Sequence, residues 1–256
     1  MRANKRLGQH FLHDPAVIER IVEAMDPRPG ERLVEIGPGR GALTYALVAR
    51  GAKLTVIELD RGLAKRLACD PVLGDVEIIR ADALRVDYNT LAGGVRLRIV
   101  GNLPYNISSP LLFRFLAASE QILDLTLMLQ REVVARMVAT PGTRAYGRLT
   151  VMLAARCRIE KLFTVGAGAF TPPPKVESAV VRLVPHAQAP FDPGDWALFA
   201  DLVRAGFSAR RKTLRNALRA YAEAGAIEAA GLDPRARPDT VPPAGYAALA
   251  RTLHED

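Results

Sequence analysis

The stretch Leu33-Val34-Glu35-Ile36-Gly37-Pro38-Gly39-Arg40-Gly41 is a short apolar run that leads directly into a glycine-rich turn. The apolar run has the length of a buried strand, and we expect a helix to begin near Ala42. The glycines permit a tight turn and let a ligand approach backbone that a Cβ atom would block. This order of strand, turn and helix is typical of the first unit of a nucleotide-binding α/β domain.

Predicted helices and strands also alternate on both sides of this stretch. Before it, residues 14–25 predict an amphipathic helix, with Asp14 as N-cap and Pro15 at the first helical position. Short apolar runs separated by helical segments recur at Leu33–Ile36, Leu54–Ile57, Val76–Ile79, Leu97–Val100 and Leu125–Leu129. Such alternation predicts parallel β/α units, whose ligands lie outside the carboxyl ends of the strands.

Later segments predict how the sheet and the chain end. The run Val176–Val184 follows Phe163–Val165 after a proline-rich loop, which indicates an antiparallel pair at the end of the sheet. The composition changes at His186–Asp195, which is rich in Pro, Ala and Asp, and helical patterns follow. We therefore expect a catalytic α/β domain at residues 1–188 and a small helical domain, suited to RNA binding, at residues 189–256.

Composition restricts the class of protein. The 256 residues are 49% hydrophobic and 24% charged, as in ordinary globular domains. The two cysteines, Cys69 and Cys157, have no metal-binding spacing, so we expect neither zinc nor a disulfide framework. The basic N-terminus has no apolar segment after it and Asp14 arrives early, so we expect no signal peptide, no membrane span and a cytoplasmic location.

The charge balance favours a polyanionic partner. The chain carries 35 Lys and Arg against 27 Asp and Glu, a net charge of +8, and its pI is about 9.9. The segment 204–219 contains no acid but does contain Arg210, Arg211, Lys212 and Arg215. These four side chains are candidates for RNA phosphate contacts. The alternative is an ordinary solvent-exposed helix face that carries several basic residues without a function.

Two acids indicate which cofactor the glycine turn serves. Glu58 ends the second strand about twenty residues after the turn, where a carboxylate can accept both ribose hydroxyl hydrogens. Gly37, Gly39 and Ala42 also satisfy the pattern of nicotinamide enzymes, and glycine turns occur without any ligand. Asp82 follows the third strand, where methyltransferases place an acid for the adenine amine. A turn aspartate that bonds its own backbone is the alternative for Asp82.

The motif after the fourth strand, Asn102-Leu103-Pro104-Tyr105, suits the methylation of an exocyclic amine. The lone pair of adenine N6 is delocalised, so carbonyls of Asn102 and Leu103 would bind the N–H groups and hold the nitrogen toward the methyl donor. Pro104 stiffens the turn and Tyr105 can stack on the base. Phe170 could close the opposite face of a flipped base, the alternative being an aromatic plug under a proline loop.

These motifs together resemble the KsgA/RsmA family of small-subunit ribosomal RNA adenine-N6 dimethyltransferases. The resemblance extends from Gly8 almost to the C-terminus. It rests on Gly8-Gln9-His10-Phe11-Leu12, Val34-Glu35-Ile36-Gly37-Pro38-Gly39, Val56-Ile57-Glu58-Leu59-Asp60, Gly101-Asn102-Leu103-Pro104-Tyr105-Asn106, Ala145-Tyr146-Gly147-Arg148-Leu149, Phe170-Thr171-Pro172-Pro173-Pro174-Lys175 and Arg210-Arg211-Lys212-Thr213-Leu214-Arg215-Asn216.

The resemblance implies a Rossmann-like class I methyltransferase sheet, mostly parallel with an antiparallel terminal strand, and a small C-terminal helical domain. It also implies a metal-free enzyme with S-adenosylmethionine as methyl donor. The substrate would be two adjacent adenosines in a hairpin loop near the 3′ end of 16S rRNA, either free or in a small ribosomal subunit precursor. The cofactor contacts would be His10, which stands where some relatives have Asn, together with Leu12, Gly37, Glu58, Asp82 and Asn102.

Three alternatives remain open on the sequence alone. An enzyme of the erythromycin-resistance type shares the glycine turn and the Asn-x-Pro-Tyr chemistry but modifies large-subunit rRNA. A ribosome-assembly factor would bind rRNA without catalysis, which intact Glu58, Asp82 and Asn102 disfavour. A DNA adenine methyltransferase usually has Asp where this chain has Asn102. We expect the protein to act as a monomer.

Overall fold

The computed structural model describes residues 8–255, which divide into two compact units. The first extends to Val134 and includes Glu160–Pro185, and the second comprises Ala135–Ile159 and the chain from His186 onward. The division that we expected from composition placed 135–159 with the α/β domain. Contacts group this segment with the helices instead, because the side chains of Tyr146 and Val151 are buried in their core.

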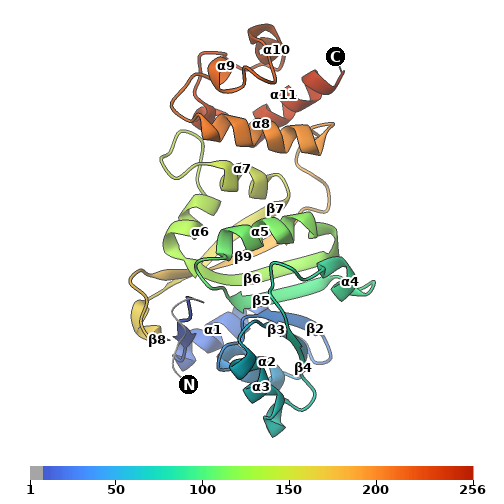
Figure 1. The fold of residues 1–256 in the computed structure, drawn as a ribbon, viewed down its shortest axis with the longest axis vertical. Coiled ribbons are helices and arrows are strands. Elements are labelled where there is room, and N and C mark those ends of the chain that lie inside the picture. The colour runs from blue at the N-terminus through green and yellow to red at the C-terminus, as the bar shows by residue number, and fades with distance from the viewer. Residues whose placement is uncertain (1–7, 256) are drawn as a thin grey trace. The chain divides into compact units, whose positions relative to one another are not determined.

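A seven-stranded sheet with the order β4-β3-β2-β5-β6-β9-β7 forms the centre of the first unit (Figure 1). The strands β2 to β6 pair in parallel, and β9 pairs antiparallel with β6, which confirms the predicted mostly parallel sheet with an antiparallel strand. The strands are β2 (Arg32–Ile36), β3 (Lys53–Glu58), β4 (Glu77–Arg80), β5 (Leu97–Asn102), β6 (Ile122–Gln130), β7 (Cys157–Val165) and β9 (Ser178–Pro185).

Helices alternate with these strands. They are α1 (Pro15–Met25), α2 (Ala42–Ala49), α3 (Arg61–Ala68), α4 (Tyr88–Ala92), α5 (Ser108–Ala117) and α6 (Arg131–Met137), with 3-10 turns at Pro71–Leu73, Ser119–Gln121 and Ala167–Ala169. The predicted start of α1 is confirmed, because Asp14 accepts hydrogen bonds from the N–H groups of Ala16 and Val17 and Pro15 follows it. The predicted helix start at Ala42 is confirmed too.

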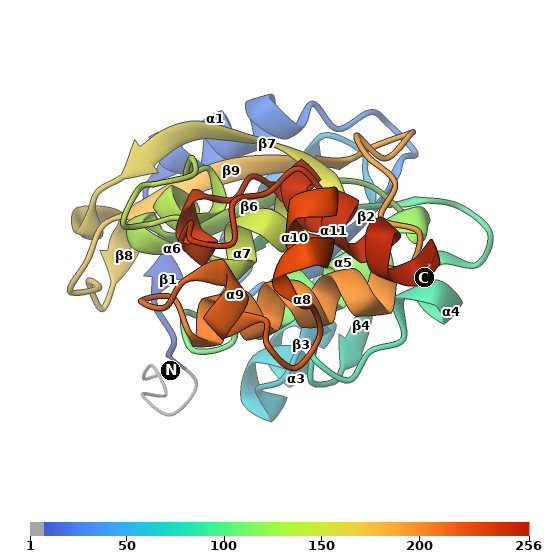
Figure 2. The same cartoon turned by 90° about the horizontal axis from the view of Figure 1, so that it is seen from above.

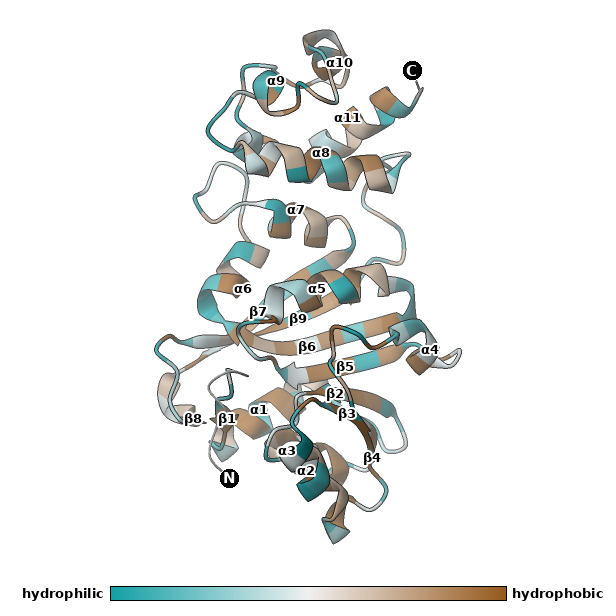
Figure 3. Ribbon diagram, in the orientation of Figure 1, coloured by the Kyte–Doolittle hydropathy of each residue, from teal (hydrophilic) through white to brown (hydrophobic). Residues whose placement is uncertain are grey.

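Apolar side chains from the helices and from the sheet form the core of this unit. Ile21 and Met25 of α1 and Leu47 of α2 are buried in one cluster with Val56 of β3 and Val100 of β5. Figure 3 shows brown, hydrophobic segments along the central strands of the sheet. Burial on both faces explains why these strands are nearly continuous apolar runs in the sequence.

A second, two-stranded sheet lies beside the first one. It pairs β1 (Phe11–Leu12) antiparallel with β8 (Phe170–Thr171), and the two strands lie side by side in both views (Figure 1, Figure 2). His13 N donates to Ala169 O at 3.0 Å and continues the pairing. This sheet holds the N-terminal arm, residues 8–13, against the proline loop at residues 170–175.

The second unit is helical. Its elements are α7 (Arg148–Ala154), α8 (Trp196–Ser208), α9 (Leu214–Ala217), α10 (Ala224–Ala229), a 3-10 turn at Pro238–Thr240 and α11 (Pro243–Glu255). Gly206 of α8 allows close packing, because a Cβ atom there would lie 2.7 Å from Tyr246 Oη. That hydroxyl donates to Pro238 O at 2.9 Å, which satisfies a buried polar group inside the core.

The strand order places a crevice between the ends of β2 and β5. From β2 the chain builds outward through β3 and β4, and then crosses back to start β5 on the other side of β2. At this switch point the neighbouring loops diverge, and α/β proteins bind ligands there. The two strands approach closely at Gly101, where a Cβ atom would lie 2.6 Å from Ile36 O.

Candidate active site

A pocket lies at the carboxyl ends of β2, β3 and β5, at the switch point of the sheet. Its wall is formed entirely by residues of the first unit. The residues of the motif Asn102–Tyr105 line it, and so do all the residues predicted for the cofactor: His10, Leu12, Gly37, Gly39, Glu58, Asp82 and Asn102.

The glycine turn after β2 has the backbone that the sequence indicated. Gly37 and Gly39 have φ angles of 67° and 58°, a left-handed region that side chains other than glycine rarely adopt. A Cβ atom at Gly39 would also lie 3.0 Å from the ring of Phe11. Gly37 N donates to Ile57 O at 2.9 Å, so the turn is fixed to the end of β3. The pocket wall here is bare backbone.

Glu58 presents a buried carboxylate at this wall. The residue is 5% exposed and accepts hydrogen bonds from Gly39 N at 3.1 Å and from Asp60 N at 2.8 Å. Burial raises the pKa of Glu58, and the two backbone N–H groups act against that rise. Because each carboxylate oxygen can accept two hydrogen bonds, both oxygens keep capacity for hydroxyl donors.

Asp82 both makes a hydrogen bond within its own turn and lines the pocket. Its Oδ1 accepts from Leu84 N at 3.0 Å, which is the bond expected of an ordinary turn aspartate. The same residue lines the pocket, and its Oδ2 lies 3.9 Å from Arg85 Nε. The turn bond is made by Oδ1, and Oδ2 has no hydrogen bond in the described residues and can accept one.

The amide of Asn102 is oriented by the N-terminal arm. Its Nδ2 donates to the backbone carbonyl of His10 at 3.0 Å. Because a carbonyl can only accept, this bond requires the NH2 group to point at His10 and leaves Oδ1 as an acceptor. Leu103 N donates to Met128 O at 3.1 Å and fixes the start of the turn that follows. An oriented side-chain carbonyl therefore stands in the pocket wall beside the motif.

His10 connects this motif to the proline loop. Its ring stacks on Tyr105 with 5.4 Å between centroids, and its Nδ1 donates to Pro172 O at 2.8 Å. The hydroxyl of Tyr105 lies 2.6 Å from Ser178 Oγ. Burial raises the pKa of Tyr105, which keeps the phenol neutral. The sequence carries no signal for this bridging role of His10, since its partners are more than 90 residues away in the chain.

Glu35 is a pocket residue to which the sequence analysis gave no role. It is 2% exposed, and its Oε2 accepts from Thr44 Oγ1 at 2.6 Å. Burial, with a smaller contribution from Glu58, raises the pKa of Glu35 to about 8. The signal was present in the sequence, because an acid inside a buried apolar strand is rare without a purpose.

The position of Phe170 does not fit the predicted role on the target base. The residue is 2% exposed and belongs to the core cluster with Leu12 and Val180, and its backbone pairs with Leu12. It is absent from the pocket wall as far as the structure describes the chain. The aromatic plug is the better description, because burial of the ring anchors β8 to the core.

The basic segment of the second unit contains two kinds of side chain. Arg210 is engaged internally, with Nε 3.0 Å from Asp239 Oδ2 and its two Nη atoms donating to Thr143 O and Arg144 O, each at 2.9 Å. Three of its five N–H donors hold a loop and its charge is paired with Asp239, so it is less available to phosphates than predicted. The other predicted RNA-binding side chains are exposed and have no polar partner within residues 8–255: Arg211, Lys212 and Arg215.

Two further arginines that the sequence analysis missed lie beside this segment. Leu214 N donates to Ala236 O at 2.7 Å and Arg215 N donates to Pro234 O at 3.0 Å. This pairing brings the exposed residues Arg235 and Arg237 next to the basic segment. We call the exposed side chains of Arg211, Lys212, Arg215, Arg235 and Arg237 the C-terminal basic surface.

Metal and membrane features are absent from the part of the chain that the structure describes. Residues 8–255 contain no group of three or more His, Cys, Asp or Glu side chains placed to hold a metal ion. Within the same residues no helix is both long and apolar enough to cross a membrane.

Comparisons with known proteins agree with this geometry. The family model described as ribosomal RNA adenine dimethylase matches residues 1–255. "Ribosomal RNA small subunit methyltransferase A" from Xanthomonas campestris pv. campestris (strain B100) is 54% identical over 250 residues, 97% of this chain and 95% of that protein. The protein of the same name from Xanthomonas oryzae pv. oryzae (strain PXO99A) is also 54% identical over 250 residues, with the same coverage.

Solved structures are similar over nearly the whole chain. A dimethyladenosine transferase from Plasmodium falciparum has a TM-score of 0.75 at 25% identity and covers 94% of this chain and 96% of its own. The 23S rRNA methyltransferase ErmE has a TM-score of 0.71 at 29% identity and covers 95% of this chain and 99% of its own. The family match and the relatives at 54% identity show that this chain belongs to the ribosomal RNA adenine dimethylase family.

Proposed function

We propose that this enzyme transfers methyl groups from S-adenosylmethionine to the N6 atoms of two adjacent adenosines in a hairpin loop near the 3′ end of 16S rRNA, as a step of small-subunit biogenesis. The observation that carries the proposal is the oriented amide of Asn102 at the edge of a pocket that also holds Glu58 and Asp82. The relatives named for the small subunit are 54% identical, against 29% for ErmE, which favours the small subunit over the large one.

The pocket fits an adenosine-containing methyl donor. Glu58 is a buried carboxylate whose two oxygens each accept one backbone N–H bond and can each accept another, as from the hydroxyl groups of a ribose. Asp82 would accept the adenine amine, and the bare backbone at Gly37 and Gly39 allows the close approach of a ligand. His10 and Leu12 would close the pocket from the N-terminal arm. When bound, S-adenosylmethionine supplies a methyl group on a positively charged sulfur.

The residues of the motif position the amine that reacts. Asn102 Oδ1 and the Leu103 carbonyl accept the two N6–H groups, which turns the nitrogen lone pair toward the methyl group. Pro104 restricts the turn, and Tyr105 offers a ring on which the base stacks. The nitrogen gains the methyl group and then loses one proton to a carbonyl acceptor or water, so no side chain has to act as a strong base.

Dimethylation requires the same acceptors to serve twice. After the first transfer N6 keeps one hydrogen, so one of the two carbonyls faces a methyl group during the second transfer. The side chain of Asn102 is held through its NH2 group by His10, and therefore remains in place when its oxygen loses a partner.

RNA affinity would come from phosphate contacts rather than from the pocket. The C-terminal basic surface offers exposed guanidinium and ammonium groups that can meet the duplex beside the loop, whereas the splayed loop bases enter the pocket. Arg210 is left out of this set, because its donors are used within the protein. We expect a monomer that acts in the cytoplasm on 16S rRNA or on a small-subunit precursor.

The experiment that tests the proposal uses separated ribosomal subunits from a strain without this modification. Incubation with labelled S-adenosylmethionine should label 16S rRNA, and digestion should yield dimethyladenosine at two adjacent positions. Label in 23S rRNA would support the erythromycin-resistance type instead. Binding to small subunits without any label would favour a pure assembly factor and overturn the proposal.

A further inference from the structure

Three arginines surround a hollow beside the active-site pocket. Arg61 begins α3, Arg80 ends β4 and Arg85 lies in the loop after β4. They line the hollow together with Leu59, Ala81 and Asp82. The elements α3 and β4 pack beside each other at the end of the sheet (Figure 1). Two successive β/α connections, separate in the sequence, thus place three cationic groups around one space.

The charge in this hollow is not neutralised. The side chains of Arg61 and Arg80 are exposed and have no hydrogen-bond or ion-pair partner within residues 8–255. Arg85 is 88% exposed and lies 3.9 Å from Asp82, whose other oxygen accepts from Leu84 N. Three cations therefore face one acid. Water screens the repulsion between these exposed groups, and an anion in the space would lower it further.

The hollow adjoins the nucleoside end of the pocket. Leu59, Ala81 and Asp82 line both spaces, so a ligand in the hollow would lie directly beside the cofactor's adenosine. The hollow, about 460 Å³ in volume, is open to solvent, so a backbone phosphate could reach it. Leu59 is 50% exposed there and adds an apolar surface next to the cations. The adenosine end of S-adenosylmethionine carries no negative charge, so it does not explain the three guanidinium groups beside it.

We propose that Arg61, Arg80 and Arg85 form a second anion site, which binds backbone phosphates of the substrate RNA next to the methylated loop. The proposal rests on the proposed function, because it takes RNA as the substrate. Guanidinium groups bind phosphate oxygens in a bidentate manner, and three of them around one hollow can hold one or two phosphates of a single strand. The site would fix the strand that leaves the pocket, whereas the C-terminal basic surface lies in the other unit.

The test replaces the three side chains together, with Arg61→Gln, Arg80→Gln and Arg85→Gln, in the full chain. A fluorescent hairpin RNA with the sequence of the 16S 3′ loop is titrated at several salt concentrations. We expect the slope of log affinity against log salt to fall by about 0.7 for each single-strand phosphate that the variant no longer binds, and affinity at low salt to fall about tenfold or more. Affinity for S-adenosylmethionine, from calorimetry, should change by less than about twofold.

A matched variant controls for net charge. Arg28→Gln, Arg32→Gln and Lys53→Gln remove the same charge from exposed positions at the opposite, amino ends of the strands, and should leave the slope unchanged. Equal slopes for the two triple variants would overturn the phosphate site. Loss of S-adenosylmethionine affinity would also overturn it, by assigning the arginines to the cofactor. The single variants repeat the titration if circular dichroism shows that the triple variant is unfolded.

Two further results separate this proposal from its premise. If the wild type methylates 16S rRNA while the triple Gln variant keeps the wild-type slope, only the second site is wrong. If the wild type neither binds nor methylates the RNA, the proposed function fails and the second site fails with it. Tighter binding of inorganic phosphate to the wild type than to the variant, without any change in RNA binding, would identify a small-anion site instead.

Discussion

The oriented side chain of Asn102 should affect the rate of methyl transfer but not the affinity for RNA. Its NH2 group is bonded to the His10 carbonyl, so its oxygen is left free to accept a hydrogen bond from the reacting nitrogen. We expect Asn102→Ala to lower single-turnover methyl transfer on the order of a hundred- to a thousandfold with both substrates saturating. RNA affinity should change little, because it depends on many phosphate contacts.

The control for this variant is Asn89→Ala, an exposed asparagine on α4. It should transfer methyl groups at the wild-type rate. Transfer by the Asn102 variant within about threefold of wild type would exclude the amine-positioning role, and Asn102 would then be only the residue that binds the N-terminal arm.

Glu58 should affect the cofactor rather than the RNA. Its carboxylate is the buried acceptor expected at the ribose, so Glu58→Ala removes a charged hydrogen-bond partner worth about 1.5–3 kcal/mol, or roughly ten- to a hundredfold in affinity. Calorimetry with S-adenosylmethionine measures this loss, with the exposed Glu120→Ala as control. Wild-type affinity in a folded variant would remove Glu58 from the ribose role.

Glu35 should make the stability of the protein depend on pH. Its pKa is raised from 4.5 to about 8 in the folded state, so between these values the native protein holds a proton that the unfolded chain has lost. Stability from this group is therefore full below about pH 4.5 and is lost as the pH rises through about 8, by at most about 1.4 kcal/mol per pH unit.

The variant Glu35→Gln removes this titration and keeps an acceptor oxygen for Thr44. Urea unfolding at several pH values between 5 and 8 should show the variant gaining stability relative to the wild type as the pH rises. Two parallel stability curves would mean that Glu35 is already ionised in the folded protein at pH 5.

At the scale of single residues, sequence spacing predicts which side chains line the pocket, but it does not predict their hydrogen-bond partners. Glu58 and Asp82 follow directly from their places after predicted strands, because parallel strands bring their carboxyl ends together. The internal bonds of Arg210 could not be predicted, because they connect it to Thr143 and Asp239 in other parts of the chain. A basic run in a sequence gives a charge, and only coordinates show which donors are already used.

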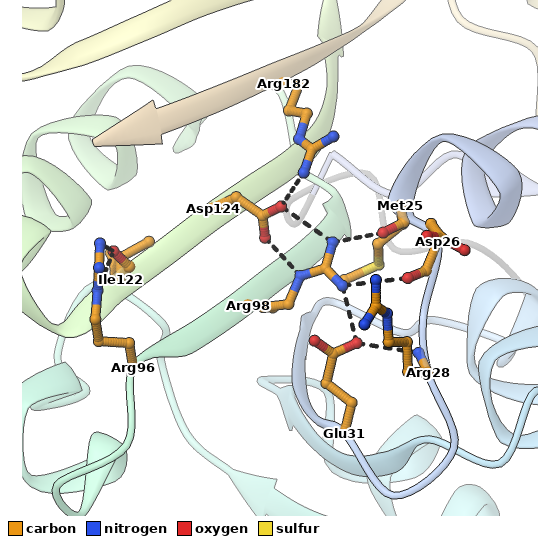
Figure 4. A network of polar contacts seen from close by, with 9 residues as sticks. All are labelled: Met25, Asp26, Arg28, Glu31, Arg96, Arg98, Ile122, Asp124 and Arg182. Carbon is orange, nitrogen blue, oxygen red and sulfur yellow. Dashed lines mark hydrogen bonds and ion pairs between the residues drawn. The ribbon is translucent and has the colours of Figure 1, made fainter. Parts of the chain in front are cut away.

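At the scale of elements, a buried ion network fixes the amino ends of the central strands (Figure 4). Arg98 of β5 bonds both oxygens of Asp124 on β6, at 2.8 and 3.0 Å, and also Glu31 at 2.8 Å. Its Nη2 donates to Met25 O at the end of α1. One guanidinium therefore links two strands to a helix at the end of the sheet that is opposite to the pocket.

We expect Arg98→Met to lower the free energy of unfolding by about 3–5 kcal/mol, because it leaves the Asp124 carboxylate buried with only Arg182 as partner. Urea unfolding measures the loss. Arg96→Met, on the exposed residue two positions earlier, should cost about 1 kcal/mol or less. If Arg98→Met lowered the free energy of unfolding no more than Arg96→Met does, the ion network would not contribute to stability beyond the packing of these strands.

The elements that the sequence predicts are those with local signals. The helix α1 has its N-cap, proline and apolar period within one segment, and all of these appear in the structure. The two-residue strands β1 and β8 have no such signal, because their pairing joins residues about 160 positions apart. This pairing holds the N-terminal arm beside the pocket, so the sequence could imply cofactor contacts for His10 and Leu12 but not the strand pairing that places them.

At the scale of the whole molecule, the composition change near residue 190 marks only one of the connections between the two units. The chain enters the second unit first at Ala135, leaves it at Ile159 and enters it again at His186. The segment 135–159 gives no composition signal, since its apolar side chains would suit either core. Its buried side chains pack in the helical core, where the Tyr146 hydroxyl donates to Val241 O at 2.8 Å.

The net charge of +8 should act on RNA in part through the exposed cations of the second unit. Replacing Arg211, Lys212 and Arg215 by Ala should flatten the salt dependence of RNA binding by about one unit for each duplex phosphate that is no longer bound. Arg210→Ala should act differently. It removes a partner from Asp239 and from two backbone carbonyls, so it should lower the stability of the second unit and leave the slope nearly unchanged. Titration of a hairpin RNA at several salt concentrations, with urea unfolding of both variants, separates the two effects. A wild-type slope for the triple variant would make the basic surface a merely solvated face, and a lowered slope for a stable Arg210→Ala variant would return Arg210 to the RNA contacts.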